Sequence, residues 1–231
     1  MGATLLEALS LLTRLDPQVV AIVWLSVKVS VSAVVFGALI GLPFGAWVAI
    51  GEFRGRTALT VFMNGMMGLP SVVVGIIVYL ALSRSGPLGS FGLLFSPPAM
   101  VIAQTILVAP LIAALTRQMI EDAWRDYAQE LRALGFSRWQ SVLTLLYDCR
   151  YSLVVGVLAG LGRTMSEVGA VMIVGGNIAG FTRVMTTAIA LETSKGDLAL
   201  SIALGFVLIA VILALNALAY VLRQWAMRRF G

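Results

Sequence analysis

One polar stretch decides how this chain is organised. It reads Asp126-Tyr-Ala-Gln-Glu-Leu-Arg-Ala-Leu-Gly-Phe-Ser-Arg-Trp-Gln-Ser-Val-Leu-Thr-Leu-Leu-Tyr-Asp-Cys-Arg150 and lies between hydrophobic segments. Ala128, Leu131 and Leu134 recur at the spacing of one helix face. Gly135 follows at the place where a helix C-terminus favours a residue that tolerates positive φ. The first half of the stretch therefore predicts a helix that ends near this glycine.

A second helix is expected just after the glycine. Ser137 and Gln140 have the spacing of a capping box, in which each side chain bonds the other residue's backbone N–H at a helix start. The stretch thus predicts a helix, a tight bend and a second helix, which together form a knob standing in water (residues 126–150). From these residues alone, the knob is either an ordinary helical hairpin or a docking element.

The composition is that of an integral membrane protein. The chain has 231 residues, of which 60% are hydrophobic and only 12% are charged, whereas roughly 25% of the residues of a soluble domain are charged. It has no histidine and a single cysteine, Cys149, which excludes the usual metal sites, internal disulfides and Cys-His catalysis. Its net charge of +5 is spread over the membrane edges, so we expect no nucleic-acid partner.

The residues also argue against an enzyme. The two lysines, Lys28 and Lys195, do not follow a glycine, so the chain contains no phosphate-binding P-loop. The sequence contains no recognisable set of a nucleophile, a general base and an orienting group. The N-terminus lacks a basic region before its first apolar run, so we expect no cleaved signal peptide. We therefore expect a membrane protein with no cofactor of its own.

Five segments are apolar and long enough to cross a membrane, which takes about 20 residues of helix. They are Val19–Ile50, Val61–Leu82, Ala99–Thr116, Tyr151–Val174 and Leu198–Leu222. Prolines inside such spans are tolerated because neighbouring groups satisfy the freed carbonyls. The predicted fold class is all-α, a polytopic membrane protein with five transmembrane helices.

Basic residues predict the orientation, because loops on the cytoplasmic side carry an excess of them. One set of span ends carries Arg54, Arg56, Arg117, Arg125, Arg132, Arg138, Arg150, Arg223, Arg228 and Arg229. The opposite set carries only Arg14, Arg84, Arg183 and Lys195. We therefore expect the N-terminus outside the cell, and the knob and the C-terminus inside it.

This topology predicts one transmembrane domain with short extensions. The expected boundaries are 1–18 for a periplasmic N-terminal segment, 19–222 for the domain and 223–231 for a cytoplasmic tail, with a cytoplasmic loop at 117–150 and an outer loop at 175–197. The middle of the outer loop, Val184–Leu191, is apolar but too short to span. It is either a surface helix or a re-entrant piece that lines an opening.

Two charges fall inside the fourth expected span. Arg163 and Glu167 are four residues apart, so we expect them on one helix face. Charges at that depth are too costly to face lipid and must face the bundle interior or a water-filled path. Either they form a satisfied pair that fixes helix packing, or Arg163 borders an anion path and Glu167 limits how tightly an anion rests there. Ser166 and Gly169 beside them permit close approach of helices or substrate.

The knob resembles the EAA loop of ABC importer permeases, which reads Glu-Ala-Ala, three residues, Gly, nine residues and Ile-x-Leu-Pro. Gln129-Glu130-Leu131, Gly135 and Ser137-Arg138-Trp139 carry the resemblance. The chain departs from the pattern at Gln129, which replaces the acid, and at Leu145-Leu146-Tyr147-Asp148, which replaces Ile-x-Leu-Pro. In that family the loop is the coupling helix that docks into a groove on an ATPase subunit. The resemblance implies an ATPase contact made by Gln129, Glu130, Leu131, Ala133, Gly135 and Arg138.

Further stretches resemble the permeases of oxyanion ABC importers. Leu25–Ser30 and Gly41–Gly45 are similar to the molybdate type, whereas Gly162–Ala170 and the outer loop from Gly175 to Ile189 are similar to the tungstate type. The resemblance implies a type I importer permease in a prokaryotic cytoplasmic (inner) membrane, working as a homodimer. The implied partners are two ATPase subunits, which hold ATP and Mg, and a periplasmic or extracellular oxyanion-binding protein. The implied cargo is tungstate, with molybdate as the second choice.

The same resemblance suggests which residues meet the cargo and the binding protein. The predicted residues of the translocation path or gate are Arg163, Ser166, Glu167, Gly169, Thr186 and Thr187. The predicted residues of the contact with the binding protein are Asn177, Thr182 and Arg183. For the hydroxyl and amide side chains, ordinary interhelical hydrogen bonding is the alternative. The rival functions are a stand-alone anion channel or secondary transporter and a purely structural subunit, although the chain shows no internal repeat.

Overall fold

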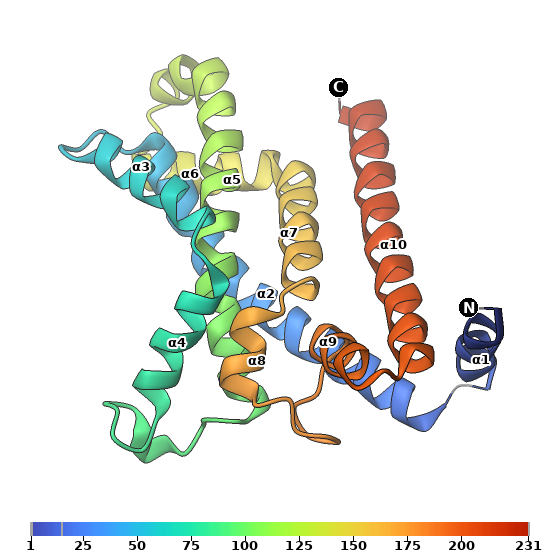
Figure 1. Ribbon diagram of the computed structural model, residues 1–231. Helices are drawn as coiled ribbons and strands as arrows, with labels where there is room; N and C mark the ends of the chain where they lie inside the picture. Colours follow the sequence, from blue (N-terminus) through green and yellow to red (C-terminus); the bar gives the residue numbers. More distant parts are fainter. Residues whose placement is uncertain (1, 15, 231) are drawn as a thin grey trace. The chain divides into compact units, whose positions relative to one another are not determined.

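The computed structural model describes residues 2–14 and 16–230, and every regular element in that part of the chain is helical (Figure 1). Residues 1, 15 and 231, in the expected N-terminal segment and tail, lie outside the described residues. The side chains of residues 2, 3, 226, 229 and 230 lie outside them as well, among them that of Arg229. The elements are α1 (Gly2–Thr13), α2 (Pro17–Ile50), α3 (Arg56–Met67), α4 (Ser71–Leu82), η1 (Gly89–Phe91), α5 (Pro97–Ala133), α6 (Arg138–Asp148), α7 (Arg150–Met165), α8 (Gly169–Gly175), α9 (Met185–Lys195) and α10 (Leu198–Phe230).

Three of these helices, α2, α5 and α10, are each long and apolar enough to cross a membrane. Two bent pairs, α3 with α4 and α6 with α7, raise the number to five if each pair counts as one span. The all-α class and a count of up to five spans agree with the sequence analysis. The chain also contains α1, a short apolar helix in the expected N-terminal segment that the pattern did not predict.

Two expected spans are not single helices. The second, Val61–Leu82, is broken between α3 and α4, where residues 68–70 are not helical. Pro70 causes this break, because it stands in extended backbone (φ −62°, ψ 119°) before α4 and disfavours helix in the residue before it. The fourth, Tyr151–Val174, is broken between α7 and α8, where residues 166–168 are not helical.

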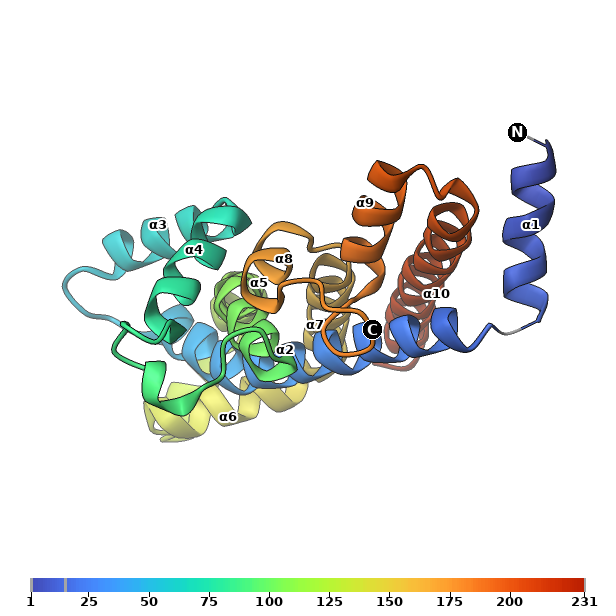
Figure 2. The same ribbon diagram turned by 60° about the horizontal axis from the view of Figure 1, so that its bottom comes forward.

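The chain forms two compact units, each assembled from several segments. Unit 1 comprises Met1–Ala33, Pro70–Gln104 and Gly162–Ala214, and unit 2 comprises Val34–Leu69, Thr105–Leu161 and Leu215–Gly231. In unit 1, α4 lies beside α8 (Figures 1 and 2). A Cβ at Gly75 would come within 2.8 Å of the Ala170 Cα, so this close approach requires glycine.

In unit 2, α2 packs tightly against the middle of α5. A Cβ at Gly45 would lie 2.3 Å from the Ala113 carbonyl oxygen, and one at Gly41 would lie 2.9 Å from that of Ala109. These two glycines are one helical turn apart, so the missing side chains let the two backbones meet. Helices α2 and α5 also carry the residues on which the predicted knob packs.

Candidate functional site

The bend of the knob has the structure that the sequence predicts. Helix α5 ends at Ala133, and Gly135 has a φ of 75°. The Phe136 N–H bonds the Leu131 carbonyl at 3.0 Å, and the Gly135 N–H bonds the Arg132 carbonyl at 3.1 Å. These two bonds form a Schellman motif, which satisfies carbonyls left free at the end of α5. The chain direction at this point is therefore fixed locally.

The predicted capping box is also confirmed. The Ser137 N–H donates to Gln140 Oε1 at 2.8 Å, and the Gln140 N–H donates to Ser137 Oγ at 3.3 Å. Both bonds satisfy backbone donors at the start of α6 that would otherwise lack a partner inside the helix. Helix α6 therefore starts at a fixed point directly after the bend.

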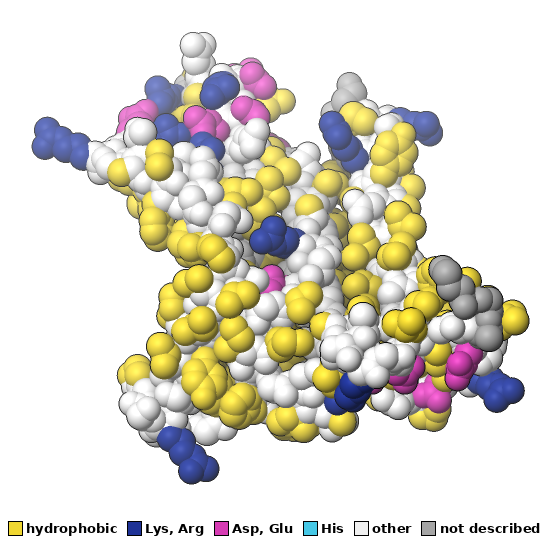
Figure 3. Space-filling view, viewed as in Figure 1, with side chains coloured by type: hydrophobic (Ala, Val, Ile, Leu, Met, Phe, Trp, Pro, Cys, Tyr) yellow, Lys and Arg dark blue, Asp and Glu magenta, His cyan; other side chains and the backbone are white. Residues whose placement is uncertain are grey.

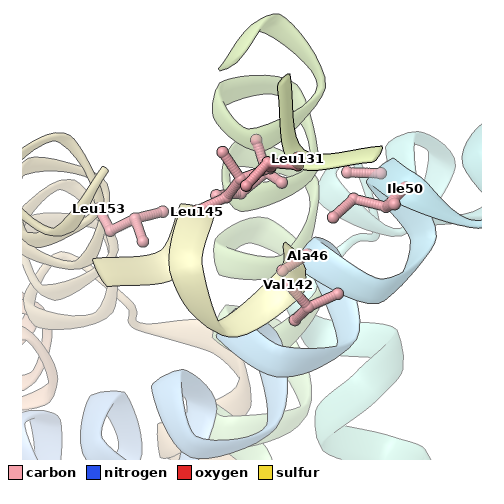
Figure 4. Packing of buried hydrophobic residues seen from close by; sticks show 8 residues of the cluster. Ala46, Ile50, Leu131, Val142, Leu145 and Leu153 are labelled. Carbon is pink, nitrogen blue, oxygen red and sulfur yellow. The ribbon is translucent and has the colours of Figure 1, made fainter. Parts of the chain in front are cut away.

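One face of α6 is buried in unit 2. Val142 and Leu145 belong to an apolar cluster with Leu131, Ala46 and Ile50, and they are 2% or less exposed. Figure 4 shows these side chains gathered between α6 and the ends of α2 and α5. The knob is thus firmly packed on its own unit and is not a free hairpin.

The opposite face of α6 is apolar and exposed. Trp139, Leu143 and Tyr147 recur every four residues and are 58%, 50% and 67% exposed, and Leu134 in the bend is 70% exposed. We call these four residues the outer face of the knob. Such a contiguous exposed apolar patch on a capped helix indicates a site for another protein. Trp139, Leu143 and Tyr147 were not predicted from the sequence as an exposed apolar row, although their four-residue spacing opposite the buried face indicates one.

The residues predicted for the ATPase contact lie in the last turns of α5, in the bend and at the start of α6. Leu131 is buried in the cluster of α6, whereas the others are exposed: Gln129, Glu130, Ala133, Gly135 and Arg138. Arg138 also forms an ion pair with Glu52 in the loop between α2 and α3. Figure 3 shows basic and acidic side chains together over this end of unit 2.

The charged pair predicted in the fourth span does not form, because its two residues do not share a helix face. Helix α7 ends at Met165, two residues before Glu167. No ion pair joins Arg163 to Glu167 in the described part of the chain, and Arg163 is exposed. The Glu167 carboxylate instead accepts the Ala170 N–H at 3.2 Å, at the start of α8. The assumption of one continuous helix was wrong.

Side chains from two other helices donate hydrogen bonds to backbone carbonyls at the break between α7 and α8. Gln104 of α5 donates its Nε2 to the Thr164 carbonyl at 3.1 Å, and the Thr186 hydroxyl of α9 donates to the Glu167 carbonyl at 2.7 Å. The Thr164 carbonyl also accepts the Glu167 N–H at 3.2 Å, so the backbone on both sides of the break is hydrogen-bonded. Gln104 is 4% exposed and was not predicted, because nothing in its local sequence marks it.

The predicted path residues near the break make hydrogen bonds within unit 1. The Ser166 hydroxyl donates to the Gly162 carbonyl at 2.9 Å, and the Thr187 hydroxyl and the Val184 backbone bond each other at 3.1 Å. Gly169 packs against Val72, whose side chain would lie 2.7 Å from a Cβ there. Thr186 and Thr187 are buried in the first turn of α9. The first turn of α9 is therefore packed inside unit 1, whereas its last residues, Thr193–Lys195, are exposed.

The residues predicted to contact a binding protein form hydrogen bonds and an ion pair within the loop at 175–197. Asn177 has a φ of 50° and donates its Nδ2 to the Thr187 carbonyl at 3.2 Å. The buried Thr182 hydroxyl donates to the Gly175 carbonyl and accepts the Ile178 N–H. Arg183 pairs with the buried Glu192 at 3.3 Å, which Lys195 also contacts. These bonds give the loop between α8 and α9 a defined shape.

The comparisons with known proteins agree with this arrangement. Residues 41–230 match the family model described as the inner membrane component of binding-protein-dependent transport systems. The chain belongs to this family. It is a permease subunit of an ABC importer, a multi-pass protein of the cytoplasmic membrane with the type I importer permease fold.

Two relatives of this permease are named for anion transport. The chain is 41% identical over 217 residues to the tungstate uptake system permease protein of Peptoclostridium acidaminophilum, covering 94% of this chain and 95% of the relative. It is 43% identical over 204 residues to a probable anion ABC transporter permease of Haloferax volcanii, covering 86% and 88% of the two chains.

The fold of the permease is similar to that of a solved structure of the MetNI methionine ABC transporter in inward-facing conformations. The TM-score is 0.64 at 16% sequence identity, and the match covers 90% of this chain and 95% of the other. At this identity the likeness concerns the fold alone. It agrees with the expected type I importer permease fold.

Proposed function

We propose that this permease is the membrane-spanning subunit of an ATP-driven importer of a tetrahedral oxyanion, with tungstate as the first candidate and molybdate as the second. The observation that carries the proposal is the outer face of the knob. It presents an exposed apolar row on a helix whose start is capped and whose other face is anchored. The tungstate name of a 41% identical relative supports the choice of cargo.

The proposed assembly has two copies of the permease, two ATPase subunits and an oxyanion-binding protein. The excess of arginine near the knob supports a cytoplasmic knob and an N-terminus outside the cell. An ATPase seated on the knob would bury Trp139, Leu143 and Tyr147, which are the kind of anchors that dominate protein interfaces. ATP and Mg bind the ATPase, and the permease itself is not catalytic. Closure of the ATPases would move the two knobs and switch the path between its inward- and outward-open states.

The proposed path runs along the break between α7 and α8. Arg163 is exposed in the last turn of α7, and a guanidinium suits a dianion because it is positively charged and carries several donors. Ser166, Glu167, Gly169, Thr186 and Thr187 complete the proposed gate. Asn177, Thr182 and Arg183 are proposed to shape the loop that meets the binding protein.

The test is co-purification of the tagged permease from its native membrane in mild detergent, followed by reconstitution. We expect a stoichiometric ATPase to travel with it, and we expect oxyanion uptake to require ATP and the binding protein. Uptake is measured separately with tungstate and molybdate. A pure homo-oligomer that passes anions without ATP would instead make the chain a channel or secondary transporter and would overturn the proposal.

A further inference from the structure

Glu52 contacts both helices of the knob, at the end of α5 and at the start of α6. It lies in the loop between α2 and α3, and its Oε1 accepts Arg132 Nη2 at 3.2 Å while its Oε2 accepts Arg138 Nη2 at 3.0 Å. Arg132 is in the last turn of α5 and Arg138 is the first residue of α6, so the two arginines lie on either side of Gly135. One carboxylate therefore spans the bend.

The loop that carries Glu52 is itself fixed to α2. The Phe53 ring stacks on the Trp47 ring with centroids 4.9 Å apart and planes 16° from parallel. Arg56 donates to two carbonyl groups in the last turn of α2 at 3.0 Å and 2.8 Å, and it contacts Glu121 of α5 at 3.4 Å. Through these contacts, Glu52 connects the bend to the end of α2.

The apolar cluster beneath α6 does not set the angle of the bend by itself. Apolar contacts are non-directional, and the directional contacts inside the bend are the two Schellman bonds and the capping box. Beside the cluster, the loop and α6 leave a groove of about 300 Å³ lined by Trp47, Ile50, Gly51, Glu52, Phe53, Arg138, Trp139 and Val142. Across this groove, the charge pairs of Glu52 supply the directional contact.

We propose that Glu52 is a positioning residue that holds the angle between α5 and α6 and carries movement of the knob to α2. The proposal rests on the proposed function. Glu52, Arg132 and Arg138 have side chains 63–66% exposed, so their pairing contributes little to the stability of the isolated chain. An ATPase seated on the neighbouring outer face removes water from the pairs and strengthens them, because charges attract more in a lower dielectric. The Glu52 ion pairs therefore hold the angle between α5 and α6 strongly only in the assembled transporter.

The test compares Glu52→Gln with Arg54→Gln in the reconstituted complex. Arg54 lies in the same loop and is exposed, and it forms no ion pair among the described residues. We expect Glu52→Gln to lower the number of anions moved per ATP hydrolysed by about fivefold, equal to about 1 kcal/mol at 1.4 kcal/mol per tenfold. ATPase co-purification and the melting temperature stay as in the wild type. Arg54→Gln leaves the ratio unchanged.

Charge reversal at Glu52 gives a second test of the positioning role. Glu52→Arg repels both arginines and is expected to lower the transport ratio further, and the double variant E52R/R132E is expected to restore part of it. A normal ratio in Glu52→Gln, or a loss that follows a lower melting temperature, would overturn the positioning role. Absence of any ATPase beside the wild-type chain would instead refute the proposed function, so the two failures are distinct.

Discussion

The two interruptions that matter in this permease, the Gly135 bend and the break between α7 and α8, are built in different ways. The backbone and capping bonds of the bend join residues within five positions along the chain, through the Schellman motif and the Ser137–Gln140 capping box, and only the exposed Glu52 ion pairs reach it from farther away. The break depends on Gln104, 60 residues from its partner, and on Thr186, 19 residues away. The bend is thus specified locally, and the break is specified by packing.

The largest expected effect comes from Gly135→Val. A β-branched residue at a φ of 75° is strained by about 1–3 kcal/mol, and because open space surrounds this position, the strain lies in the backbone alone. We expect ATP-driven uptake to fall at least about tenfold, since 1.4 kcal/mol changes an equilibrium tenfold, while dimerisation in detergent persists. Uptake in proteoliposomes measures the effect.

Gly135→Asn is the matched control, because asparagine tolerates the left-handed region. It should retain most of the uptake. If the valine variant transports tungstate normally, the bend does not couple the ATPase to the path.

The two faces of α6 should respond differently to truncation. Leu145→Ala removes a fully buried side chain and is expected to destabilise the chain by about 2–5 kcal/mol, read as a lower melting temperature in detergent. Leu143→Ala, on the exposed face, should leave that temperature unchanged and reduce recovery of the ATPase in pull-downs. Equal effects of both variants on stability would contradict the division into an anchored and a docking face.

Gln104→Leu tests the break. Loss of one buried hydrogen bond is expected to destabilise the chain by about 1 kcal/mol, which lowers the melting temperature by about 2–4 °C for a chain of this size. Gln118→Leu, at an exposed position of the same helix, is the control and should not shift it. An unchanged melting temperature in the Gln104 variant would show that the break does not depend on this side chain.

The smallest effect is expected from Ser137→Ala. Removing one side of the capping box costs about 1 kcal/mol or less at an exposed helix start, and the Schellman motif next to it remains. We expect a melting temperature within about 2–4 °C of the wild type and nearly normal uptake. A complete loss of uptake would mean that the cap does more than start α6.

The contrast between the locally bonded bend and the break held by distant residues explains which parts of this molecule could be predicted from the sequence. Residue types at short spacing predicted the bend, the capping box and the apolar segments, because local chemistry determines them. The expectation that Arg163 and Glu167 share one helix face was wrong, because α7 ends at Met165, two residues before Glu167. Gln104 and Glu52 were missed because their partners are 60 to 86 residues away. The row Trp139, Leu143 and Tyr147 could have been found from its four-residue spacing.

The exposed outer face of the knob also has a consequence for the life of the protein before assembly. In the proposed assembly, a copy without its ATPase would leave Leu134, Trp139, Leu143 and Tyr147 uncovered, and apolar surface of this kind attracts chaperones, proteases and other copies. Subunits made in excess would then be removed, while those that bind an ATPase would be shielded. The surface proposed to receive the ATPase would thereby also limit how many permeases the membrane keeps.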